Sequence, residues 1–350
     1  MTVIEQTATA DDRAHVREAW RARRRRTTVV TIALALAGVI AFCVELAVGD
    51  YPIPLLDVVP ALLGQGDGGV GFIMFEHRLP RAAAAVLVGA AFGLSGAVFQ
   101  SLARNPLASP DIIGITAGSA VSAVFLILVL QLSGVVLSIG TLVGALLTAA
   151  VIYLLAYRRG IAPMRMVLIG IAVGFFCEAL ISFMFSRARI YDVQRATQWL
   201  TGSLGGLGWD EVIPLFAFLL VLVPSVLMMA RPLRTIQLGE ATATGLGVKV
   251  ELSRAGLFIV AVGLAAVATA AAGPVAFVAF VAGPIARRMT GTSLTLVPAA
   301  LTGAVLLLVS DVIARTMFAP IQLPVGVVTA IIGAPYLIYL LSRTYRGREG

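Results

Sequence analysis

Ten long apolar stretches fill most of this 350-residue chain and constrain its fold more than any other feature. They lie at residues 27–49, 82–100, 110–130, 134–156, 164–186, 210–230, 253–272, 274–286, 295–314 and 324–342. A helix needs about 20 predominantly apolar residues to cross the hydrocarbon of a membrane, and only the eighth stretch is clearly shorter. A mean hydropathy of +0.97 with 13% charged residues excludes an ordinary soluble domain. The pattern predicts an all-α, polytopic membrane protein with ten transmembrane helices.

Basic residues gather in alternate gaps between these stretches. Twenty of the 26 Lys and Arg residues lie at the two ends of the chain or in the gaps that an even number of crossings puts on the same side. Because cytoplasmic loops are enriched in Lys and Arg, this bias places both termini in the cytoplasm. The six outward residues are Arg78, Arg81, Arg187, Arg189, Arg195 and Arg315.

Hydropathy divides the chain into three parts. Residues 1–26 are predicted to form a flexible, basic cytoplasmic tail with a short interfacial helix around Trp20. Residues 27–343 form one transmembrane domain, and residues 344–350 form a short cytoplasmic tail. Small residues recur at four-residue spacing within the apolar stretches, which predicts close helix packing. The pairs are Gly89/Gly93, Gly140/Gly144 and Gly170/Gly174.

Several functional classes lack the residues that they require. The net charge of +8 does not indicate a nucleic-acid-binding protein. The dense cluster of basic residues, Arg23 to Arg26, lies at the predicted membrane boundary and not on the face of a soluble domain. Cys43 and Cys177 lie inside apolar stretches, and the two histidines are far apart, so no metal site is expected. Paired catalytic acids, zinc motifs and the phosphate-binding loop of ATPases are absent from the sequence, so we expect no enzyme activity.

Three carboxylates lie within apolar stretches, where an ionisable group is costly and is a candidate for function. Glu45 is close to a helix end and is expected to extend its carboxylate to the membrane surface. Asp311 has Arg315 one turn later, a spacing at which side chains meet. Glu178 has no such neighbour and is expected to line a pore or to make a buried hydrogen bond. An ion-coupled secondary transporter, in which such groups carry protons or sodium, remains an alternative.

A series of motifs runs in order over about residues 70 to 343. They are Arg78-Leu79-Pro80-Arg81, Arg104-Asn105-Pro106, Ser109-Pro110-Asp111, Trp199-Leu200-Thr201-Gly202, Leu238-Gly239-Glu240, Gly245-Leu246-Gly247, Gly273-Pro274-Val275, Ile285-Ala286-Arg287-Arg288, Leu323-Pro324-Val325-Gly326 and Gly333-Ala334-Pro335. This series resembles the FecCD/BtuC family of ABC importer permeases, and within it the ferric enterobactin branch. The family usually has Pro-His before Ile-Ala-Arg, whereas this chain has Gly283-Pro284, so no role is assigned to that position.

The resemblance implies the fold of type II ABC importer permeases, in the cytoplasmic membrane of a bacterium. The expected function is ATP-driven import of iron(III)-siderophore complexes, with haem and vitamin B12 as alternative cargoes of the same family. The implied partners are a second permease subunit, more often a related protein than an identical copy, two ATPase subunits and an extracytoplasmic siderophore-binding protein. The chain itself is expected to bind no cofactor, since ATP and Mg²⁺ belong to the ATPase subunits.

The resemblance also assigns roles to individual residues. Residues 236–248 correspond to the coupling helices that dock on the ATPase, with contacts at Gly239, Glu240, Gly245 and Gly247. Of the outward arginines, Arg78, Arg81 and Arg315 correspond to those that receive glutamates of the binding protein. For Arg315 an ion pair with Asp311 is the competing interpretation.

Overall fold

The computed structural model of the chain describes residues 10–49, 51, 53–63, 68–157, 163–319 and 321–346. Within these residues the chain forms helices and no β-strand, as the sequence predicts. Each of the ten apolar stretches contains one long helix. These helices are α1 (Ala10–Ala47), α4 (Leu79–Ala103), α5 (Ile115–Leu128), α6 (Val135–Ala156), α7 (Pro163–Arg187), α9 (Trp209–Met228), α12 (Val250–Ala272), α13 (Val278–Thr290), α14 (Leu296–Thr316) and α15 (Val325–Arg346).

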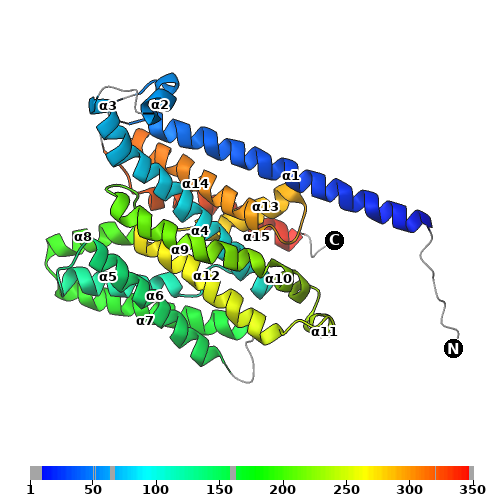
Figure 1. Cartoon of the computed structure of the whole chain (residues 1–350). Coiled ribbons are helices and arrows are strands. Elements are labelled where there is room, and N and C mark those ends of the chain that lie inside the picture. Colours follow the sequence, from blue (N-terminus) through cyan, green and yellow to red (C-terminus); the bar gives the residue numbers. More distant parts are fainter. Residues whose placement is uncertain are drawn as a thin grey trace.

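Short helices connect some of the long ones. They are α2 (Leu55–Leu62), α3 (Gly68–Phe72), the π-helix η1 (Ile73–Arg78), α8 (Ile190–Leu200), α10 (Ala230–Gln237) and α11 (Glu240–Gly245). Figure 1 places α2, α3 and α8 at one end of the bundle. The start of α1, the pair α10 and α11, and the end of α15 lie toward the opposite end. We call these the outer end and the inner end, after the charge pattern of the sequence.

Seven helices of the described residues are long and apolar enough to cross a membrane. Helices α5 and α13 have 14 and 13 residues, which is roughly 20 Å of helix against about 30 Å of hydrocarbon. The prediction that the eighth stretch is short is therefore confirmed in α13. The third stretch is shorter than predicted because residues 104–114 form turns, with Arg104 at φ 49° and Gly114 at φ 80°. By length and composition, the described part of the chain does not contain ten helices that each cross the full hydrocarbon thickness.

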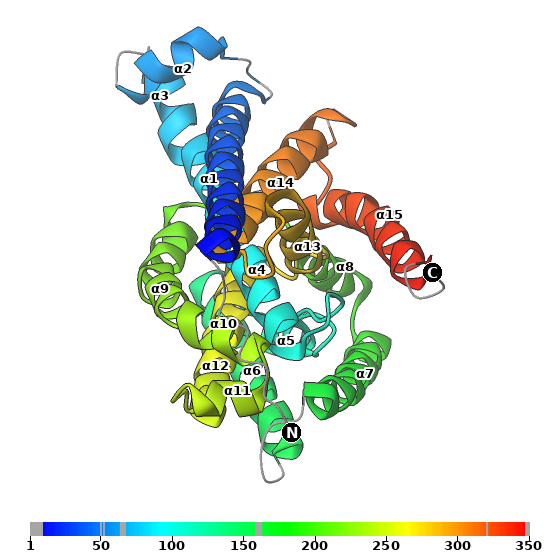
Figure 2. The same ribbon diagram turned by 90° about the vertical axis from the view of Figure 1, so that its right-hand side faces the viewer.

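Helix α4 is the most deeply buried of these spans and packs against α12, α13 and α14 in the centre of the bundle (Figures 1 and 2). Glycine allows this approach. A Cβ at Gly89 would lie 2.5 Å from the carbonyl oxygen of Gly303, and one at Gly303 would lie 2.1 Å from that of Gly89. Both distances are shorter than any real contact, so α4 and α14 meet backbone to backbone. The predicted close packing is confirmed for the pair Gly89/Gly93, since a Cβ at Gly93 would lie 2.3 Å from the carbonyl oxygen of Ala299.

The predicted tail boundaries differ from the helices. Helix α1 already begins at Ala10, so residues 10–26 continue the first apolar helix and are not a separate flexible segment. The physical reason is composition, because this stretch is rich in Ala and Arg and contains neither Gly nor Pro. Residues 1–9 and 347–350 of the two predicted tails lie outside the described residues, as do Arg158, Arg159 and Arg348 of the charge pattern. Helix α15 extends to Arg346, into the predicted C-terminal tail.

Candidate functional site

The outer end of the bundle contains a hollow of about 1160 Å³. All three arginines that the sequence singles out as docking residues line it, namely Arg78, Arg81 and Arg315. Arg78 ends η1, Arg81 lies in the first turn of α4, and Arg315 lies in the last turn of α14. Residues far apart in the sequence thus bring three cations to one cavity wall.

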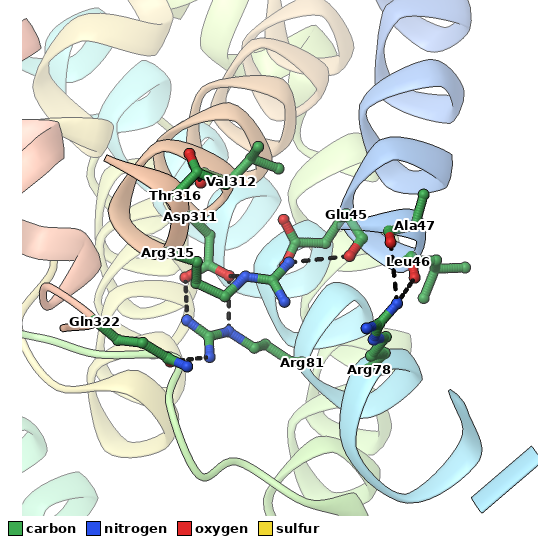
Figure 3. Close-up of polar contacts among 10 residues, drawn as sticks. All are labelled: Glu45, Leu46, Ala47, Arg78, Arg81, Asp311, Val312, Arg315, Thr316 and Gln322. Atoms are coloured by element: carbon green, nitrogen blue, oxygen red, sulfur yellow. Dashed lines mark hydrogen bonds and ion pairs between the residues drawn. The ribbon is translucent and has the colours of Figure 1, made fainter. Parts of the chain in front are cut away.

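Two of these arginines form a buried ionic network with two carboxylates (Figure 3). Arg81 donates to Asp311 from Nε at 2.7 Å and from Nη2 at 2.9 Å, which is a bidentate pair. Its Nη1 donates to Gln322 Oε1 at 3.1 Å. Arg315 Nη2 pairs with the carboxylate of Glu45 and also donates to the Glu45 carbonyl oxygen at 2.9 Å. The network joins α1, α4 and α14.

The network pairs two arginines with two carboxyl groups, and all four side chains are almost completely removed from solvent. The side chains of Glu45 and Asp311 are 1% and 0% exposed, and those of Arg81 and Arg315 are 12% and 7% exposed. Removing one member would leave a buried charge without its partner, which is strongly unfavourable. The expectation that Glu45 reaches the membrane surface is wrong, because Arg315 holds its carboxylate inside the bundle.

The competing interpretation for Arg315 is borne out in part. Arg315 Nε lies 3.6 Å from Asp311 Oδ2, so the predicted pair one helical turn apart exists. The nearer partner of each residue is nevertheless on another helix, Glu45 for Arg315 and Arg81 for Asp311. Such pairs between distant parts of the chain leave no periodic signal in one sequence.

Arg78 has a different local role. Its Nη1 donates to the carbonyl oxygens of Leu46 at 2.6 Å and Ala47 at 3.1 Å, and its Nη2 donates to the carbonyl of Tyr51 (Figure 3 draws the first two). The last carbonyls of a helix have no partner within the helix and attract cations. Arg78, which is itself buried, therefore caps the C-terminus of α1.

The predicted coupling segment, residues 236–248, contains the last two residues of α10 and the whole of α11, and both short helices lie at the inner end (Figure 1). Gly239 joins them with φ 121°, a conformation that favours glycine. Gly247, with φ 82°, follows α11 and has open space where a Cβ would lie, as has Gly245. The side chains of Leu238 and Leu246 are exposed on the same segment.

Two arginines fix this segment to the bundle. Glu240 Oε1 accepts a hydrogen bond from Arg254 Nη2 of α12 at 2.5 Å. This hydrogen bond, with the positive charge of Arg254, lowers the pKa of the Glu240 carboxyl. Arg104, at the end of α4, donates to the carbonyl oxygen of Ile236 at 2.5 Å. A movement of α11 is thereby connected to α12, and a movement of α10 to α4.

The third candidate carboxylate lies on the surface of the chain. Glu178 is exposed on α7, the least buried of the seven spans. A buried hydrogen bond within this chain is therefore excluded for Glu178, while a position beside a pore remains compatible with its exposure. Among the described residues no three His, Cys, Asp or Glu side chains are grouped as metal ligands.

Sequence reasoning did not foresee a polar contact between α4 and α13. Gln100 donates from Nε2 to the carbonyl oxygen of Phe280 at 2.9 Å and accepts from Arg287 Nη2 at 2.7 Å. Gly283 makes room for it, because a Cβ there would lie 2.3 Å from Gln100 Oε1. Glycine at position 283 is therefore required by the packing of Gln100 against α13.

The same arrangement of helices occurs in a transporter of known structure. A chain of a transporter assigned to the metal-chelate type of ABC transporter, solved in an inward-facing conformation, superposes with a TM-score of 0.81. It is 28% identical, and the match covers 90% of this chain and 99% of that one. The fold is that of the membrane subunit of an ABC transporter. The chain belongs to the FecCD transport family, whose model matches residues 14–343.

Individual relatives match over nearly the same region. The ferric enterobactin transport system permease protein FepG of Escherichia coli (strain K12) is 41% identical over 326 residues, which are 92% of this chain and 98% of FepG. The iron(3+)-hydroxamate import system permease protein FhuG of Bacillus subtilis (strain 168) is 38% identical over 331 residues, with coverage of 92% and 98%.

Proposed function

We propose that this chain is the permease subunit of an ATP-driven importer that carries iron(III)-siderophore complexes across the bacterial cytoplasmic membrane. The observation that carries the proposal is the similarity, over more than nine-tenths of the chain, to two permeases named for iron(III) chelates. Because the match covers 98% of each relative, the similarity extends over the whole of each permease subunit and not only over a shared segment.

In this proposal all ten long helices cross the membrane, and both termini lie in the cytoplasm. The short helices α5 and α13 are compatible with it, because α5 packs among α6, α7 and α12, and α13 packs between α4 and α14. A helix that is enclosed by other helices does not have to span the full thickness of the hydrocarbon, because the polar backbone groups beyond its ends are buried in protein and not exposed to lipid. The charge pattern of the loops supports the orientation.

The translocation path would lie between this chain and a second permease subunit, which we take to be a related protein. Helix α7 supports this arrangement, because it is the least buried span and carries exposed Phe175, Phe176 and Glu178. A carboxylate near the middle of a span is costly against lipid. The face of α7 that carries Glu178 would therefore border the partner or the aqueous path.

Energy would come from two separate ATPase subunits, which bind ATP and Mg²⁺, while this chain is non-catalytic and binds no cofactor. The inner segment of α10 and α11 would dock on one ATPase through Gly239, Glu240, Gly245 and Gly247 and the exposed Leu238 and Leu246. The contacts of Arg254 and Arg104 supply a mechanical connection, since they join this segment to α12 and α4.

An extracytoplasmic siderophore-binding protein would dock over the outer hollow, where Arg78, Arg81 and Arg315 line the wall. Glu45 and Asp311 already pair with two of these arginines. Acidic side chains of the carrier would therefore have to share these arginines with the carboxylates of this chain, or displace them.

The cargo is tested by uptake into proteoliposomes that contain this chain with its second permease, ATPase and binding protein. Radiolabelled ferric enterobactin, a ferric hydroxamate, haem and cobalamin are supplied in parallel with ATP inside. We expect accumulation of iron from one or both ferric siderophores and none of haem or cobalamin. Accumulation of haem or cobalamin without ferric siderophore would contradict the proposed cargo.

A further inference from the structure

The basic start of α1 is not used by the importer proposed above. Between Arg21 and Arg26 there are five arginines and no acidic residue. All five side chains are exposed. In an α-helix successive residues turn by about 100°, so the five arginines from Arg21 to Arg26 point to all sides and form a collar around the helix. A collar differs from the one-sided stripe that a protein surface packed along the helix would require.

The position of the collar along α1 agrees with the headgroup layer of a membrane. From Thr27 to Ala47 the helix is about 31 Å long at 1.5 Å per residue, close to the roughly 30 Å of hydrocarbon. The collar covers the next turn and a half toward the inner end, or about 8 Å. A headgroup layer is about 5–8 Å thick on each side of the bilayer.

Arg26 ties the collar to the neighbouring helix α13. Arg26 donates from Nε to the carbonyl oxygen of Met289 at 2.9 Å and from Nη2 to that of Arg288 at 3.2 Å, both at the C-terminal end of α13. Trp20 is 61% exposed, and the guanidinium of Arg24 lies 5.4 Å from its ring centroid. An exposed tryptophan beside the first charged turns is typical of the membrane–water interface.

We propose that Arg21, Arg23 and Arg25 bind the phosphate groups of anionic phospholipids in the cytoplasmic leaflet. Within the described residues no hydrogen bond or ion pair occupies the side chains of these three arginines, whereas Arg24 stacks on Trp20 and Arg26 holds α13. Arginine suits phosphate oxygens because its planar guanidinium donates two parallel hydrogen bonds. Basic clusters directly beside a span attract anionic lipids, by about fivefold in affinity for each residue.

The full-length chain in neutral detergent is titrated with dansyl-labelled phosphatidylglycerol and, separately, with dansyl-labelled phosphatidylcholine, by energy transfer from tryptophan. We expect tighter binding of phosphatidylglycerol, and at least a tenfold loss of this preference in R21Q/R23Q/R25Q. The lysine variant R21K/R23K/R25K keeps the charge and is expected to keep most of the preference. Inorganic phosphate at the same concentration should compete weakly, because it lacks the acyl chains.

The matched control is R187Q/R189Q/R195Q, which removes the same charge from three exposed arginines of the outer end. It is expected to keep the preference. Equal losses in both glutamine variants would reduce the effect to net charge and overturn the proposal. Full competition by inorganic phosphate would also overturn the proposal. An unchanged lipid preference in R21Q/R23Q/R25Q together with weaker binding of the ATPase would overturn it too, and would assign the collar to a protein contact. Because lipid binding is measured without cargo, failure here is distinct from failure of the proposed import.

Discussion

Arg81 of α4 holds the carboxylate of Asp311 of α14 with two parallel hydrogen bonds of 2.7 and 2.9 Å, although 230 residues separate them. Asp311 has no exposed side-chain surface. The pair closes the outer end of the same two helices whose backbones meet at Gly89 and Gly303 deeper in the bundle. Arg81 thus contributes to the stability of the membrane domain whatever else it binds.

The first prediction concerns this stability. R81Q leaves Asp311 buried without its main partner, and we expect a loss of about 3–5 kcal/mol in the free energy of unfolding. The double variant R81Q/D311N removes both charges and should recover most of this loss. Unfolding in mixed micelles, followed by circular dichroism, measures both. R189Q, on the exposed surface, is the control, and a loss in R189Q equal to that in R81Q would show that the ion pair is not the cause.

The second prediction separates docking from stability. If Arg81 receives an acidic residue of the binding protein, R81Q/D311N regains its fold but keeps at least a tenfold weaker affinity for that protein, since a buried charged hydrogen bond is worth roughly 1.5–3 kcal/mol. Affinity is measured by surface plasmon resonance on immobilised permease complex. An affinity that recovers together with stability would limit Arg81 to its role inside the chain.

The third prediction is a pH dependence at the inner end. The pKa of Glu240 is lower in the folded chain than its ordinary value near 4.5, because Arg254 donates to its carboxylate. The ion pair therefore stabilises α11 above about pH 4.5, and this contribution disappears as the pH falls through the lowered pKa. Amide hydrogen exchange of α11, corrected for intrinsic rates, should accelerate over that range. E240Q should exchange faster already at pH 7 and lose the pH dependence; retained pH dependence in E240Q would assign it to another group.

The fourth prediction tests the packing of α4. A Cβ at Gly96 would lie 1.7 Å from the carbonyl oxygen of Ala279, so G96A forces α4 and α13 apart. We expect a loss of about 1–3 kcal/mol or more in the free energy of unfolding. G69A is the matched control, because a Cβ added at Gly69 would have no neighbouring atom within 4 Å. Alanine is also slightly more favourable than glycine in a helix. Equal thermal stability of the two variants would contradict the close approach seen here.

Hydropathy and charge sufficed to locate the long helices. A membrane crossing appears as a long apolar stretch, and the loops on one side of the membrane are enriched in Lys and Arg. They failed where the cause is tertiary. The partner of Glu45 is Arg315, on a helix that is remote in sequence, so only the folded chain shows that the carboxylate turns inward. The start of α1 was missed because its arginines favour a helix as strongly as its apolar residues do.

The candidate site was foreseen in residue identity more than in role. The family motif predicted which arginines gather at the outer end, and the hollow contains all three. Their internal partners could not be predicted, because bonds to the carbonyls of Leu46 and Ala47 depend on where α1 ends. Exposure of Glu178 likewise depends on which face of α7 its neighbours leave open.

In the proposed importer, ATP hydrolysis by a partner subunit drives import through this chain. Proteoliposomes with the complete complex are loaded with ATP, and uptake of ferric siderophore delivered by the binding protein is measured with and without a proton ionophore. A second preparation contains an ATPase that binds ATP but cannot hydrolyse it. We predict uptake that persists with the ionophore and falls to background with the inactive ATPase. Uptake that continues with the inactive ATPase and collapses with the ionophore would contradict the account and favour an ion-coupled secondary transporter.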